Sequence, residues 1–138
     1  MRLLIIDDDR LLHHQLKRHL RGHSIRACLL PREVNDSDLR WADVVLIDWT
    51  FPPPCLEARD RIIAMAIQLK KPVAVNTAWP VDDVHVPPQA IVLRKEACAW
   101  ADSQVAKWLG AVLKPPAKTP KQQFAHGVLA MLGLAAAR

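Results

Sequence analysis

Short, continuous apolar runs recur along the chain and are separated by longer stretches of mixed polarity. Four of these runs are strong and one, the second, is weaker: Leu3–Ile6, Ile25–Leu30, Val44–Ile47, Val73–Val75 and Ala90–Leu93. An uninterrupted apolar run is typical of a strand that is buried on both faces of a parallel sheet. The pattern therefore predicts five parallel strands.

Helical periodicity is found in three of the stretches outside these apolar runs. Apolar side chains recur on one helical face in residues 10–21, 55–70 and 97–113. Two other connections are poor helix material, because residues 31–40 offer only a short turn and prolines interrupt residues 79–89. Alternating strands and helices predict an α/β fold, a doubly wound parallel sheet with helices on both faces, whose second and fourth helices are short or missing.

A proline-containing segment separates a domain from a tail. A chain of 138 residues suits one hydrophobic core, so we expect a single domain over residues 1–114. Residues 115–138 are expected to form a linker and a short C-terminal helical extension, with the helix over residues 120–137. The apolar stripe of that helix would be exposed if it stood alone. It could fold back on the domain, but a neighbouring subunit is the favoured partner, which would make a homodimer.

The net charge of +5 comes from the end of the chain. Residues 1–102 hold 14 basic and 14 acidic residues, whereas the remaining stretch has five basic residues and no acidic one. Spread charges of this kind are more typical of a solvated surface than of a phosphate-binding one. We therefore do not expect nucleic acid as a partner.

The cysteines and the apolar runs bear on the cellular compartment. Cys28, Cys55 and Cys98 are isolated and odd in number, so neither a disulfide framework nor a zinc site is indicated, and a reducing cytoplasm fits. The first apolar run meets acidic residues too soon for a signal peptide, and the longest run near the other end falls well short of the roughly 20 residues of a membrane span. The sequence predicts a cytoplasmic protein that makes no membrane contact.

Four of the predicted strands end in residues that can carry chemistry: Asp7, Asp8 and Asp9 after the first, Asp48 at the third, Thr77 at the fourth and Lys95 at the fifth. In an open parallel sheet, the carboxyl ends of the strands meet at one edge, where ligands bind. Each residue alone could be an ordinary turn or helix-capping residue. Their joint placement favours one functional site.

This set of residues suits phosphoryl transfer assisted by Mg²⁺. The metal prefers hard oxygen ligands, and phosphoryl transfer depends mainly on positioning and on charge neutralisation. Asp48 is the candidate phosphoacceptor, while Thr77 and Lys95 could bind the phosphoryl oxygens. The candidate metal ligands are Asp7, Asp8, Asp48 and the main-chain carbonyl of Thr50.

The segments that hold these residues resemble the response-regulator receiver family. They follow the family's order over about residues 1–113: 4–9, 43–48 with Pro52, 73–78 and 91–95. The resemblance implies a flavodoxin-like sheet of order 2-1-3-4-5 in a signalling module that is not an enzyme. It also implies that Asp48 accepts a phosphoryl group from a histidine kinase or phosphotransfer protein, with Mg²⁺ held by Asp7 and Asp8 and with Thr77 and Lys95 sensing the phosphoryl group.

The sequence departs from the family pattern at the positions that transmit the signal. Glu96 stands where the family usually has proline, Val92 replaces an aromatic residue that moves on activation, and prolines interrupt the fourth helix. Trp79 lies at a position that tends to modulate phosphoryl lifetime in the family. The chain is thus expected to be an atypical receiver that acts by protein contact.

Two other functions compete with this interpretation. A phosphorylation-independent pseudo-receiver would keep the fold and serve as an interaction or dimerisation module. Against it, this sequence keeps all five residues of the family's phosphoryl site: Asp7, Asp8, Asp48, Thr77 and Lys95. A haloacid-dehalogenase-like phosphatase would use Asp7 and Asp9, but its acidic pair should follow the lysine, whereas Asp82 and Asp83 precede it. The phosphatase leaves Asp48 without a role and is the weaker alternative.

Overall fold

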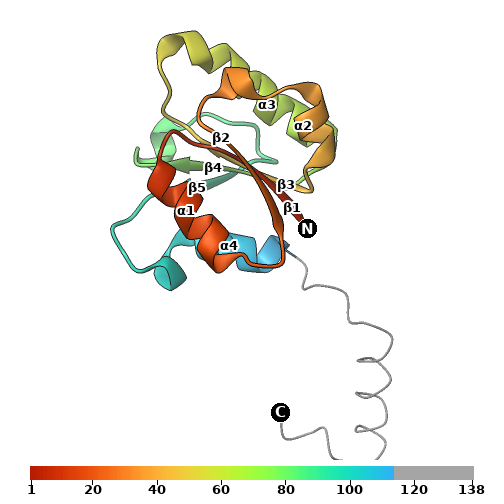
Figure 1. Cartoon of the computed structure of the whole chain (residues 1–138). Helices are drawn as coiled ribbons and strands as arrows, with labels where there is room; N and C mark the ends of the chain where they lie inside the picture. The colour runs from red at the N-terminus through yellow and green to blue at the C-terminus, as the bar shows by residue number, and fades with distance from the viewer. Residues whose placement is uncertain (114–138) are drawn as a thin grey trace, which may run out of the picture.

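Five parallel strands form one sheet in the computed structural model, which describes residues 1–113 (Figure 1). The strands are β1 Arg2–Ile6, β2 Ser24–Cys28, β3 Val44–Asp48, β4 Val73–Thr77 and β5 Ile91–Arg94. Their order in the sheet is β2-β1-β3-β4-β5. The predicted doubly wound fold and its strand order are confirmed. The weak run ends as a strand at Cys28 because Leu30 already caps a 3-10 turn that begins at Pro31.

Four α-helices connect or follow the strands: α1 Arg10–His19, α2 Asp36–Trp41, α3 Leu56–Gln68 and α4 Gln104–Val112. Helix α1 begins where the Asp9 carboxylate accepts a hydrogen bond from the Leu11 N–H at 2.9 Å. The expected helix over residues 97–113 starts later than predicted, because Ser103 caps α4 and a 3-10 turn, Trp100–Asp102, precedes it.

Prolines shape the connection between β4 and β5, as expected. It holds a single 3-10 turn, Val81–Asp83, in place of an α-helix. Val84 and Ala90 from this connection are buried against the core that α3 covers. An irregular segment therefore covers the part of the sheet that a fourth helix would cover in a fully alternating fold.

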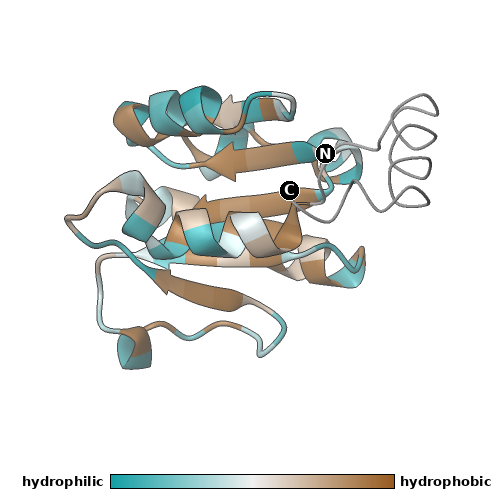
Figure 2. Ribbon diagram, turned by 90° about the horizontal axis from the view of Figure 1, so that it is seen from below, coloured by the Kyte–Doolittle hydropathy of each residue, from teal (hydrophilic) through white to brown (hydrophobic). Residues whose placement is uncertain are grey.

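Two apolar layers enclose the sheet, with α2 and α3 on one face and α1 and α4 on the other (Figure 1). Figure 2 shows the strands in the colours of apolar residues, while the helices mix apolar and polar positions. Side chains alternate between faces along a strand. Because Ile5, Leu46 and Ala74 pack toward α1 and α4, the residues two positions further along each strand lie on that same face.

Beyond residue 113, the expected linker and the helix over residues 120–137 lie outside the described residues, and the homodimer that depends on them stays a prediction. None of the helices within residues 1–113 is long and apolar enough to cross a membrane.

Candidate functional site

The predicted site residues gather at the carboxyl edge of the sheet. Asp48 and Thr77 are the last residues of β3 and β4, and Asp7 and Lys95 directly follow β1 and β5. The pairing of Ile6 with Ile47 places Asp7 beside Asp48 in neighbouring strands. The topology thus brings together residues that lie as far as 88 positions apart in the sequence.

Three carboxylates converge in this edge. Asp7, Asp8 and Asp48 each offer an oxygen, and these oxygens all lie within 4.8 Å of one another. Asp7 and Asp48 are buried, whereas Asp8 is exposed. The carboxylates of Asp7 and Asp48 therefore lie in a low-dielectric environment, and that of Asp8 lies beside them in contact with solvent.

Lys95 supplies the opposite charge. Its Nζ lies 3.1 Å from Asp48 Oδ1 and 3.3 Å from Asp7 Oδ2. The Lys95 N–H donates to the Thr77 carbonyl at 2.7 Å, which fixes the start of the loop after β5. Lys95 follows the edge strand β5, and its ammonium pairs with carboxylates at the ends of β1 and β3.

The protonation of these groups follows from their burial and mutual charge. Burial, reinforced by the charge of Asp48, raises the pKa of Asp7 from 3.8 to about 6. Burial also raises the pKa of Asp48, although Lys95 opposes the change. Burial alone would lower the pKa of Lys95, but the charges of Asp48 and Asp7 outweigh it and raise that pKa.

Thr77 and Thr50 lie at the site but make local contacts. The Thr77 hydroxyl accepts a hydrogen bond from the Trp79 N–H at 2.9 Å, and within residues 1–113 it makes no hydrogen bond to Asp48. The Thr50 N–H lies 3.4 Å from Asp48 Oδ1. Thr50 is therefore close to Asp48 in sequence, and Thr77 follows the residue that pairs with Asp48 in the sheet. The expected roles of both threonines remain predictions.

The acidic group fits a small, hard dication. Asp7 Oδ1 accepts a hydrogen bond from the Asp9 N–H at 2.8 Å, whereas Asp7 Oδ2 is buried and accepts none from residues 1–113. Lys95 meets this oxygen only as an ion pair, at 3.3 Å. One buried carboxylate oxygen without a hydrogen bond from the described residues, clustered with two further carboxylates, matches the hard oxygen ligands that Mg²⁺ prefers.

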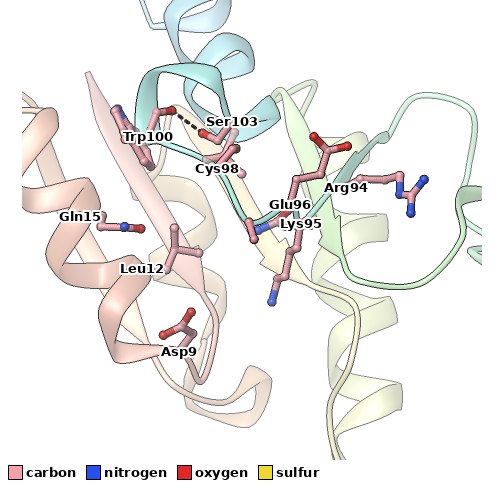
Figure 3. Close-up of a pocket in the computed structure, with 12 residues that line it drawn as sticks. Asp9, Leu12, Gln15, Arg94, Lys95, Glu96, Cys98, Trp100 and Ser103 are labelled. Atoms are coloured by element: carbon pink, nitrogen blue, oxygen red, sulfur yellow. Dashed lines mark hydrogen bonds between the residues drawn. The ribbon is translucent and has the colours of Figure 1, made fainter.

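Asn76 is a polar residue of this region that the sequence analysis did not single out. Its backbone pairs with that of Asp48, and its side chain is only 3% exposed. The Asn76 Oδ1 atom is buried and has no hydrogen-bond partner among residues 1–113, and Asn76 lines a cavity of about 200 Å³ together with Lys95. Figure 3 shows Asp9 and the Lys95 ammonium at one end of this cavity and Trp100 and Ser103 at the other.

A buried arginine was also missed. Arg59 of α3 is 7% exposed and lies against Trp49, the residue that follows Asp48. Asn76 could have been noticed in the sequence, because the residues that precede it in β4 are all apolar. Arg59 stands three, four and seven positions before Ile62, Ile63 and Ala66, so the helical spacing places it on their buried face and could have signalled it.

Comparison with solved structures identifies the fold. The response regulator TrrA from Thermotoga maritima, solved in complex with Mg(2+)-BeF, superposes with a TM-score of 0.56 at 17% identity, covering 81% of this chain and 98% of that one. The receiver domain of the hybrid histidine kinase CckA gives 0.54 at 16% identity, covering 83% and 100%. A response regulator from Burkholderia pseudomallei, solved with a phosphorylated aspartic acid, a calcium ion and citrate, gives 0.50 at 17% identity, covering 96% and 86%.

The chain therefore has the fold of response-regulator receiver domains, as its strand-end residues indicated. No protein-family model matches the sequence, and a search of curated proteins finds no match.

Proposed function

We propose that this protein is a receiver domain that accepts a phosphoryl group on Asp48 from a histidine kinase or phosphotransfer protein. The observation that carries the proposal is the convergence of three carboxylates and Lys95 at the carboxyl edge of a receiver fold. Bound Mg²⁺ would neutralise charge on the phosphoryl oxygens. Asp7, Asp8, Asp48 and the main-chain carbonyl of Thr50 would hold it.

The side chains divide the remaining work. An Asp48 carboxylate oxygen attacks the phosphorus atom, the P–N bond of the donor phosphohistidine breaks, and the imidazole takes a proton from solvent. Lys95, already 3.1 Å from Asp48, would bind a transferred phosphoryl oxygen through its ammonium. The Thr77 hydroxyl would donate to another oxygen. The resulting signal passes by protein contact in the cytoplasm, and the chain itself acts as a signalling module and not as an enzyme.

Two of the similar structures support this assignment. The Thermotoga maritima regulator was solved with Mg(2+)-BeF, and the Burkholderia pseudomallei regulator with a phosphorylated aspartic acid and a divalent cation. These ligands belong to those proteins. Their relevance to this chain rests on the shared fold together with the acidic cluster found here.

Phosphorylation is tested directly by incubating the protein with acetyl phosphate and Mg²⁺ and measuring intact mass. We expect one added phosphoryl group in the wild type and none in Asp48→Asn. Asp43→Asn is the matched control, because Asp43 precedes the other end of the same strand and should leave the adduct unchanged. A wild type without an adduct, or an adduct that persists in Asp48→Asn, contradicts the proposal.

A pseudo-receiver is the second candidate, and the connection between β4 and β5 favours it. That segment holds no α-helix in the described structure, and Val92 offers no ring to move upon phosphorylation. Such a protein would bind its partner equally well with and without the phosphoryl group. The absence of an adduct in the mass experiment is the result expected for this candidate.

A further inference from the structure

A buried arginine lies directly behind the phosphoacceptor loop. The Arg59 guanidinium carbon is 3.5 Å from the centroid of the Trp49 ring, so the two groups stack. Arg59 Nη1 donates to the main-chain carbonyl of Trp49 at 2.7 Å. Arg59 Nε pairs with Asp60 Oδ1 at 3.0 Å, and Asp60 is exposed. One side chain of α3 thus holds both the ring and the backbone of Trp49.

Trp49 links the two residues whose positions matter most to the proposed site. It lies between Asp48, the phosphoacceptor, and Thr50, whose carbonyl is the proposed metal ligand. The Trp49 N–H donates to the Asn76 carbonyl at 3.1 Å, while its own carbonyl accepts from Arg59. The backbone at Trp49 is therefore tied to β4 on one side and to α3 on the other.

Fold stability alone gives a weak reason for an arginine at this position. Burial of a guanidinium is unfavourable unless it is well paired, and here the ion-pair partner is a 62% exposed carboxylate. An apolar side chain could pack on the Trp49 ring with less desolvation. It could not donate to the Trp49 carbonyl, and that hydrogen bond orients the peptide unit leading into Thr50.

We propose that Arg59 is a positioning residue of the phosphoryl site, which holds the Asp48–Thr50 backbone through the Trp49 carbonyl so that the Thr50 carbonyl can bind Mg²⁺. This inference rests on the proposed function. Residues that support metal ligands from behind typically change metal affinity by about 10- to 100-fold when they are replaced. Arg59 occupies such a supporting position, because the carbonyl to which it donates belongs to Trp49 and not to a proposed metal ligand.

The test is isothermal titration of the full chain with MgCl₂ alone. Arg59→Met removes both the stacking and the hydrogen bond to the carbonyl, and we expect its Mg²⁺ affinity to fall about tenfold. Arg61→Met is the matched control, since Arg61 lies on the same helix, pairs with Asp36 and donates to the Val34 carbonyl at 3.0 Å, away from the site. It should bind Mg²⁺ as the wild type does.

Two further variants separate positioning from general packing. Trp49→Leu keeps the carbonyl that Arg59 binds and should lose less Mg²⁺ affinity than Arg59→Met. Arg59→Lys keeps a donor without the planar fork, so we expect an affinity about threefold below that of the wild type. If Arg59→Met fails to fold, the Lys variant decides the question.

The outcomes distinguish this inference from the proposed function. A wild type that binds no Mg²⁺ overturns both. If the wild type binds Mg²⁺ and Arg59→Met binds it with equal affinity, the positioning role alone is overturned. If Arg59→Met does not fold, equal affinity of Arg59→Lys has the same consequence. An equal loss in Arg61→Met also overturns it, because the effect would then belong to any arginine removed from α3.

Discussion

Replacement of Asp7 by asparagine is expected to stabilise the metal-free protein at neutral pH. The Asp7 carboxyl is 1% exposed, and burial with the nearby Asp48 charge raises its pKa to about 6. At neutral pH the wild type must therefore keep an unfavourable buried charge ionised. Asparagine has nearly the same shape and carries no charge, so the substitution removes this cost.

The pH dependence has a definite sign. Because the folded-state pKa of Asp7 lies above the ordinary value of 3.8, the folded protein binds more protons than the unfolded chain between those two pH values. The free energy of unfolding should fall as pH rises through this window. At about 1.36 kcal/mol per pH unit, the full effect is roughly 3 kcal/mol above the folded-state pKa. The opposing effect of the Lys95 charge is already contained in this pKa, so we expect a net gain of about 1–3 kcal/mol.

Urea unfolding in the presence of a chelator measures this gain. Asp7→Asn should be more stable than the wild type at about pH 7.5, and the difference should nearly vanish at about pH 4. Asp43→Asn is a control of opposite sign, because hydrogen bonds from Arg2 lower the pKa of Asp43. That carboxylate contributes stability at neutral pH, which is lost as pH falls through its folded-state pKa. An Asp7→Asn variant that is no more stable at neutral pH, or equally stabilised in acid, refutes the reasoning.

Three other predictions follow from single side chains. Lys71→Met removes an ammonium that donates to the carbonyls of Leu39, Arg40 and Ala42, so urea unfolding should show a loss of about 1–2 kcal/mol, with no such loss in the Lys70→Met control. Asn76→Val removes an Oδ1 atom that has no hydrogen-bond partner in the described part of the chain and should raise the free energy of unfolding by about 1 kcal/mol; a destabilised variant would show that the amide has a partner. Trp79→Ala should shorten the lifetime of phosphorylated Asp48, followed by intact mass, because the half-exposed indole beside Thr77 would hinder an attacking water; an unchanged or longer lifetime contradicts this shielding.

Much of the fold could be predicted because its determinants are local in sequence. Five short apolar runs became the five strands, since a strand covered on both faces has no polar side to interrupt it. Proline correctly excluded a helix before β5. The start of α4 was predicted too early, because periodicity continues through Trp100 while the chain there forms a 3-10 turn that Ser103 terminates.

The candidate site could also be predicted only in part. Topology alone brings strand ends to one edge, so Asp7, Asp48 and Lys95 could be placed together without knowledge of any contact. The spacing of α3 places Arg59 on the buried face, but its hydrogen bond to the Trp49 carbonyl could not be predicted, because it depends on how α3 packs on the loop after β3. Likewise, the sequence does not reveal that the Asn76 amide oxygen finds no hydrogen-bond partner within residues 1–113.

The surroundings of the Asp7 carboxylate are unfavourable in two separate ways. The Asp7 carboxyl carries a raised pKa, and its Oδ2 atom is buried without a hydrogen bond from the described residues. A nearby dication would stabilise the ionised carboxylate and would also satisfy that oxygen, whereas an anion would worsen both. The ionised carboxylates of Asp7, Asp8 and Asp48 together carry three negative charges. Lys95 and a monovalent cation would supply only two positive charges between them. The charges and contacts of these residues therefore favour a divalent cation on grounds that are independent of the resemblance to receiver domains.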